Sequence, residues 1–166
     1  MSNDRLQVVQ EKLEQIPVGK DGLRLWLRIM TCSQMIEEQI KSILREEFNM
    51  TLPRFEVMAA LDRVPDGLSM VELSRWLMVT KGNITGIAER LSEDKYITRR
   101  PTPTDRRSFC VTLTPEGREL YQKMAERYEH CIDEIFVDIS QEEMDAFMGL
   151  LSKTKDAVDS FKTSRP

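Results

Sequence analysis

The chain has 166 residues, of which 40% are hydrophobic and 31% are charged, and its net charge is −4. These values are typical of a folded domain with a real core and exclude a disordered chain. No apolar run approaches the roughly 18–20 residues of a membrane span, and the first residues, Met-Ser-Asn-Asp-Arg, do not resemble a signal peptide. We therefore expect a cytoplasmic protein without membrane contact.

The first half of the chain is predicted to be helical. The pattern is compatible with a short helix over residues 6–13 and strongly favours a long helix over residues 21–48. A further helix should start near Thr51 or Leu52, because Pro53 then occupies the first turn, where proline is favoured. Pro65-Asp66-Gly67 should close this helix.

Residues 69–77 carry the signature of a short helix. Ser69 and Glu72 form a capping box, in which the serine oxygen caps the helix start and the glutamate reaches back. Leu73, Trp76 and Leu77 should give this helix one apolar face. The pattern breaks over residues 78–80, which predicts a sharp turn.

A second helix is predicted directly after this turn, with Thr80 as its cap. Ile84, Ile87, Ala88 and Leu91 are spaced so that they form one buried stripe. The opposite side is small, polar or basic, as in a recognition helix that meets the edges of DNA bases. These two helices predict a helix-turn-helix.

Residues 96–113 predict a strand, a turn and a second strand, with arginines on both sides of the turn. Such a hairpin after a helix-turn-helix is a basic β-wing. Residues 75–107 hold eight basic and four acidic side chains, a net charge of +4, so the rest of the chain carries −8. The local field governs contact with phosphates, so this asymmetry favours duplex DNA as partner despite the acidic total.

Two further helices are predicted after the wing. Thr114, Pro115 and Glu116 form a strong start signal, and Ser140 and Glu143 form a second capping box. The terminal helices are more apolar than one winged helix needs, which favours a homodimer; packing of the first long helix on the last is the alternative. The predicted fold is mainly α (α+β), with dimerisation helices at 1–52 and 114–166 around a winged helix-turn-helix at 53–113.

The chain resembles the MarR family of bacterial transcription regulators over nearly its whole length. The resemblance is carried by residues 105–108 and 111–117 of the wing and next helix start, supported by residues 73–77 and 83–91. It implies a homodimeric repressor that binds a palindromic operator in double-stranded DNA and is released by a small aromatic ligand. Residues 77–86 also resemble members that respond to aromatic or hydroxycinnamoyl thioesters of coenzyme A.

The predicted DNA contacts lie on the helix-turn-helix and the wing. Short polar side chains can bond phosphates, Asn83 can bond an adenine edge, and one wing arginine should enter the minor groove. The predicted DNA-binding residues are Ser69, Arg75, Thr80, Lys81, Gly82, Asn83, Thr85, Gly86, Arg90, Arg99, Asp105, Arg106, Arg107 and Ser108.

An effector site is predicted where the first long helix meets the winged helix-turn-helix. Aromatic and methionine side chains suit a flat ligand, although any one of them can equally be ordinary core. The candidate effector-binding residues are Trp26, Ile29, Met30, Ser33, Ile36, Arg54, Phe55, Met58 and Phe109, and Arg28 or Arg63 are further candidates to pair with an acidic group.

Three other functions are disfavoured. An enzyme would need a catalytic set, but the single histidine, His130, precedes Cys131 on a helix, so the two side chains diverge. We expect no metal site and no cofactor. A winged-helix adaptor between proteins would have little need for basic residues at the wing tip. A redox sensor using Cys32 is disfavoured because this cysteine lies in an apolar stretch, where burial would make it inert.

Overall fold

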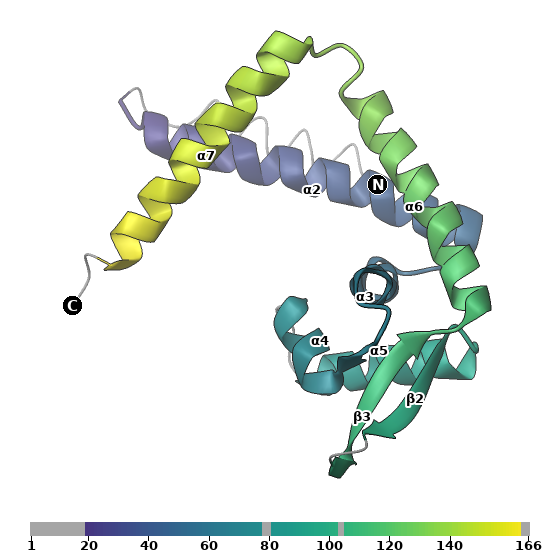
Figure 1. Ribbon diagram of the computed structural model, residues 1–166. Helices are drawn as coiled ribbons and strands as arrows, with labels where there is room; N and C mark the ends of the chain where they lie inside the picture. Colours follow the sequence, from purple (N-terminus) through teal and green to yellow (C-terminus); the bar gives the residue numbers. More distant parts are fainter. Residues whose placement is uncertain (1–18, 78–80, 103–104, 164–166) are drawn as a thin grey trace. The chain divides into compact units, whose positions relative to one another are not determined.

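The computed structural model describes residues 19–77, 81–102 and 105–163 (Figure 1). The predicted helix over residues 6–13 and the capping residue Thr80 lie outside these ranges. The described residues form two compact units, which meet between residues 129 and 130. Its elements, labelled as in Figure 1, are α2 (Asp21–Phe48), α3 (Leu52–Arg63), β1 (Leu68–Ser69), α4 (Met70–Trp76), α5 (Lys81–Glu93), β2 (Ile97–Thr102), β3 (Asp105–Leu113), α6 (Pro115–Ile135) and α7 (Gln141–Thr163).

The long first helix has the predicted length but is buried only near its C-terminal end. Ile40 and Leu44 of α2 are buried, whereas the earlier apolar side chains Leu25 and Trp26 are each 56% exposed. The helix ends where Asn49 adopts the left-handed conformation and donates its N–H to the carbonyl of Arg45. The N-terminal half of α2 therefore presents apolar side chains that the other described residues of the first unit leave exposed.

α3 is the central helix of the first unit and contacts α2, α4, α5 and β3. It begins at Leu52, and Pro53 lies in its first turn as predicted. Its buried residues include Phe55, Val57 and Met58. Burial of these side chains provides the apolar core on which the helix-turn-helix and the sheet are assembled.

The capping box that starts α4 is confirmed in both directions. Ser69 Oγ accepts a hydrogen bond from the backbone N–H of Glu72 at 3.2 Å, and the Ser69 N–H donates to the Glu72 carboxylate at 2.7 Å. The bond from the Ser69 backbone holds the pKa of Glu72 below its usual value. The predicted apolar face is only partly correct: Leu73 is buried and Leu77 is half-buried, but Trp76 is 48% exposed because the described elements packed on α4 leave its indole uncovered.

α5 buries the predicted stripe, with Ile84, Ala88 and Leu91 fully inaccessible and Ile87 half-buried.

The strands form a three-stranded antiparallel sheet in the order β1-β3-β2, in which β2 and β3 are the wing. The pairing runs from Ile97 with Leu113 at the base to Thr102 with Asp105 at the tip, with an irregularity between Pro101 and Thr102. The winged helix-turn-helix and the mainly helical fold class are thus confirmed.

The base of the wing is tied to the start of α6 through Thr114. Its hydroxyl donates to the carbonyl of Lys95 at 2.8 Å and accepts from the N–H of Gly117 at 2.9 Å, as expected of a capping threonine. Gly117 is buried so closely that an added Cβ would lie 2.0 Å from the Tyr96 carbonyl oxygen. The contact is with backbone, so the neighbour cannot move aside without displacing the wing.

We therefore expect Gly117→Ala to lower the free energy of unfolding by about 2 kcal/mol or more, as overpacked cores do. Urea denaturation at a fixed protein concentration measures this. Gly22→Ala is the matched control, because its Cβ would meet nothing within 4 Å and α2 should be unchanged or slightly stabilised. Equal stability of the two variants would contradict the close contact.

The second unit contains the end of α6 and the whole of α7. Ser140 and Glu143 form the predicted capping box, with the Glu143 N–H donating to Ser140 Oγ at 3.3 Å and the Ser140 N–H to the carboxylate at 2.9 Å. Hydrogen bonds from the side chain and then the backbone of Ser140 lower the pKa of Glu143. The apolar side chains of α7 are largely exposed, among them Phe147, Met148, Leu150, Leu151, Val158 and Phe161.

Candidate nucleic-acid interface

The exposed side of α5 is small, polar and basic. Gly82, Asn83, Gly86 and Arg90 are exposed, and Thr85 is half-buried. These residues lie opposite the buried stripe of the same helix. The packing of α5 therefore leaves the predicted reading surface open to a partner.

The two glycines of α5 are not required by packing within the described chain. A Cβ added at Gly82 or at Gly86 would meet nothing within 4 Å. Glycine inside a helix costs about 1 kcal/mol relative to alanine, so these positions carry a cost that internal contacts do not explain. Close approach of an external partner, such as a DNA backbone, is the reason that we expect for both glycines.

The other predicted contacts are placed in different ways. Ser69 is engaged as the cap of α4, and Arg75 is exposed on that helix. Lys81 begins α5, and residues 105–108 begin β3 directly after the wing tip; their side chains are outside the described part of the structure. Arg106 and Arg107 are therefore placed by their backbone register alone.

Arg99 points back toward the recognition helix. Its Nη2 donates to the carbonyl oxygen of Thr85 across 3.5 Å, its side chain is partly buried, and its Nε is buried without a hydrogen-bond partner. This contact joins β2 to α5. It suggests that Arg99 positions the recognition helix against the wing, a role that the sequence pattern did not indicate.

We expect Arg99→Gln to weaken DNA binding several-fold without changing the dependence of log Kd on log salt concentration. Removing a phosphate contact lowers that salt slope by about one, whereas removing a positioning contact does not. Arg90→Gln on the exposed side of α5 is the comparison and should lower the slope. Fluorescence anisotropy with a labelled duplex at several salt concentrations gives both numbers, and a reduced slope in Arg99→Gln would assign it to DNA contact.

The predicted effector residues differ widely in burial. Phe55 and Met58 belong to the core, and the Phe55 ring lies 5.4 Å from that of Tyr128 and 5.6 Å from that of Tyr121. Others are exposed, such as Trp26 and Phe109. Met30 and Ser33 are also exposed, and Ile29 and Ile36 are half-buried.

A hollow of about 590 Å³ lies between the C-terminal half of α2, the start of α3 and α5. Of the nine candidate effector residues, only Arg54 lines it. The sequence reasoning missed Lys41 and Arg45, which also line it. The sequence feature that could have indicated them is their spacing of four residues, which places two cations on one side of α2.

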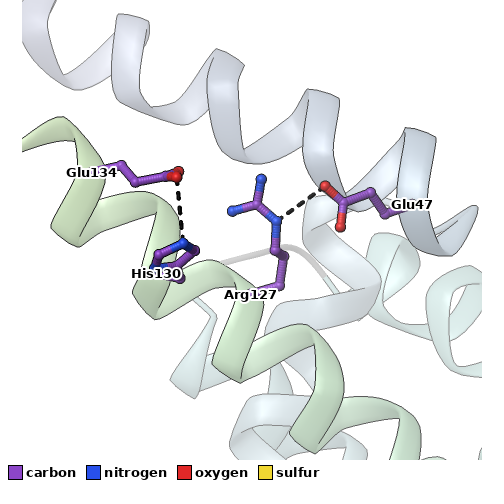
Figure 2. A network of polar contacts seen from close by, with 4 residues as sticks. All are labelled: Glu47, Arg127, His130 and Glu134. Carbon is purple, nitrogen blue, oxygen red and sulfur yellow. Dashed lines mark hydrogen bonds and ion pairs between the residues drawn. The ribbon is translucent and has the colours of Figure 1, made fainter.

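Figure 2 shows two ion pairs on α2 and α6. Arg127 Nε lies 3.1 Å from Glu47 Oε1, which ties α6 to the end of α2. The single histidine, His130, is exposed and pairs with Glu134 one turn later at 3.4 Å. Cys131 is buried, so it does not form a nucleophile–base pair with its exposed neighbour.

The expected burial of Cys32 is wrong. Cys32 is exposed, because the buried residues of α2 lie further along the helix at Ile40 and Leu44. Cys110 is half-buried in β3, and its thiol donates to the carbonyl of Asp66 at 3.2 Å.

None of the described helices combines the length and the apolar composition that crossing a bilayer requires.

A sequence model of the MarR family matches residues 48–108, which covers the helix-turn-helix and most of the wing. The chain belongs to the MarR family. The transcriptional activatory protein BadR of Rhodopseudomonas palustris is 33% identical over 105 residues, which are 62% of this chain and 59% of BadR. The chain thus matches less than two thirds of that relative. The uncharacterized HTH-type transcriptional regulator YkoM of Bacillus subtilis is 31% identical over 118 residues, 70% of this chain and 74% of YkoM.

Solved structures of MarR regulators have the same fold. A MarR family transcriptional regulator from Silicibacter pomeroyi is 28% identical with a TM-score of 0.72, over 87% of this chain and 99% of its own. A mutant MarR from E. coli, complexed with operator DNA, has a TM-score of 0.71 at 22% identity, over 84% and 99% of the two chains. The chain therefore has the fold of the MarR regulators.

Proposed function

We propose that the protein is a homodimeric repressor that binds a palindromic operator in double-stranded DNA. In each subunit α5 enters the major groove and the β2–β3 wing follows the adjacent minor groove. The observation that carries this proposal is the open side of α5, with Gly82, Asn83, Gly86 and Arg90, beside a hairpin rich in arginine. The structural neighbour complexed with operator DNA supports it.

The proposed dimer uses the helices that flank the winged helix, within residues 1–52 and 114–166. Exposed apolar side chains on the N-terminal half of α2 and on α7 support this, since such stripes seldom stay in water. A two-fold pair of subunits would present two recognition helices about 34 Å apart, the distance between successive major grooves.

The proposed effector is a small aromatic compound or its coenzyme A thioester, which would release the operator. Support comes from the resemblance of residues 77–86 and from the exposed aromatic residues Trp26 and Phe109. Such a ligand acts only if it prefers a dimer whose recognition helices are wrongly spaced for DNA. Repression is the proposed outcome.

The test is selection of duplex fragments from the chromosome that encodes the chain, followed by footprinting and a reporter gene. We expect a protected palindrome, binding that weakens steeply with salt, and higher reporter expression when the gene for this protein is deleted. Binding without sequence preference would contradict the proposal of a specific operator. Lower reporter expression after deletion of the gene for this protein would indicate an activator.

A further inference from the structure

The C-terminal end of the recognition helix α5 is closed by a Schellman motif. The Tyr96 N–H donates to the carbonyl of Leu91 at 2.9 Å, and the Lys95 N–H donates to that of Ser92 at 3.0 Å. Lys95 adopts the left-handed conformation, with φ of 63°, which glycine adopts at less cost. Asp94, directly before Lys95, is therefore the C-cap residue of α5.

Asp94 carries an unfavourable charge for this position. The C-terminus of a helix is partially negative, so it favours a cation and disfavours a carboxylate. Asp94 forms an ion pair with Arg54, which lies in the first turn of α3, where the partial positive charge disfavours a cation. Neither charge is explained by its own helix, whereas the ion pair between the two helices compensates both.

The two members of this ion pair differ in burial. The side chain of Arg54 is 13% exposed, whereas that of Asp94 is 48% exposed. The Nε of Arg54 is also buried without a hydrogen-bond partner in the described part of the chain. Loss of the carboxylate would leave a nearly buried guanidinium uncompensated, which is the costly way to break an ion pair. The burial of Arg54 thus makes the position of Asp94 matter.

The residues that follow Asp94 form the base of the wing. The Lys95 carbonyl accepts a hydrogen bond from the Thr114 hydroxyl at 2.8 Å, and the Tyr96 carbonyl accepts one from the Thr114 N–H at 3.0 Å. β2 begins directly afterwards at Ile97. The end of α5 and the start of the wing are therefore fixed to each other, and the ion pair with Arg54 ties both to α3.

We propose that Arg54 is a positioning residue for DNA binding. Through Asp94 it holds the end of α5 and the base of the wing against α3, and it acts without contacting DNA. Arg99 holds the first half of the same helix through the Thr85 carbonyl, so two arginines fix α5 at two points. The effect on DNA binding rests on the proposed function, whereas the restraint on α5 does not.

The sign of the effect of Asp94→Ala tests this role. Removal of a negative charge beside a DNA-binding helix should by itself strengthen binding to phosphates. We expect the opposite, an operator affinity at least about fivefold weaker, as loss of a charged hydrogen bond implies. Glu93→Ala is the matched control, because it removes the same charge from the preceding exposed residue and should bind at least as tightly as the wild type. Fluorescence anisotropy measures both affinities, and equal affinities of the two variants overturn the proposal.

The variant Arg54→Met tests whether the two residues act as a pair. We expect Arg54→Met to bind the operator more weakly than the wild type with the wild-type salt slope, because no phosphate contact is lost. The double variant with Asp94→Ala should bind no more weakly than Asp94→Ala alone, since the uncompensated guanidinium is then absent. A reduced salt slope in Arg54→Met, or factors that multiply in the double variant, overturns the proposal.

Amide hydrogen exchange of the full chain without DNA tests the restraint on α5 directly. In Asp94→Ala and in Arg54→Met we expect the Tyr96 N–H to exchange at least about tenfold faster than in the wild type. Amides in the middle of α3 should keep their rates, as should Tyr96 in Glu93→Ala. Equal acceleration throughout α3 and α5 would show a general loss of stability and overturn a positioning role. If the wild type binds no duplex while Tyr96 exchanges as expected, the proposed function fails and the restraint on α5 stands.

Discussion

Replacing Arg106 and Arg107 together with alanine is expected to lower operator affinity by about a hundredfold or more. The register of the sheet pairs Asp105 with Thr102 at the wing tip, so residues 106 and 107 follow the tip directly. Each dimer would lose four guanidinium groups. Between two and four of them should contact the sugar–phosphate backbone or the minor groove, so the salt slope should fall by about two to four.

The matched control for the wing is Lys153→Ala with Lys155→Ala. Both lysines are exposed on α7, and their replacement removes the same charge from the second unit. Anisotropy titrations at several salt concentrations should show wild-type affinity for this control. A wing variant that keeps both its affinity and its salt slope would remove the wing from the DNA interface.

The second large effect is expected on α7. Phe147 and Leu151 lie one turn apart and are 49% and 39% exposed. If these side chains are buried between two subunits, Phe147→Glu with Leu151→Glu places charges in an apolar contact, and each change counts twice in the dimer. We expect the dissociation constant of the dimer to rise at least about a hundredfold.

Sedimentation equilibrium measures this dissociation constant directly. Gln141→Glu with Ser152→Glu adds the same negative charge to exposed polar positions of α7 and should leave the dimer intact. Circular dichroism should report a similar helix content for both variants. A Phe147→Glu/Leu151→Glu protein that remains a tight dimer would exclude this side of α7 from the subunit interface.

Local signals in the sequence predicted much of the fold. The capping boxes at Ser69 and Ser140 and the capping threonine Thr114 depend on residues within three positions of each other, and the structure shows each one. The buried stripe of α5 follows from helical periodicity alone. For the same reason the positions of the helix-turn-helix and the wing were predictable.

Features that depend on tertiary packing were not predictable in this way. Trp76 matched the apolar pattern of α4, yet whether an indole is covered depends on elements elsewhere in the chain. Cys32 lies in an apolar stretch whose neighbours on α2 are themselves uncovered. Arg45 and Arg90 both line the hollow between α2, α3 and α5, and no local pattern predicts that residues so far apart in the sequence share one site.

The most direct test of the account is the dependence of affinity on half-site spacing. The footprinted operator is compared with a duplex in which about five base pairs, half a helical turn, are inserted between its half-sites. A dimer with two fixed recognition helices should bind the altered duplex at least about a hundredfold more weakly, because the second half-site then faces away. Equal affinity for the two duplexes would contradict the simultaneous binding of two half-sites by the two recognition helices of one dimer.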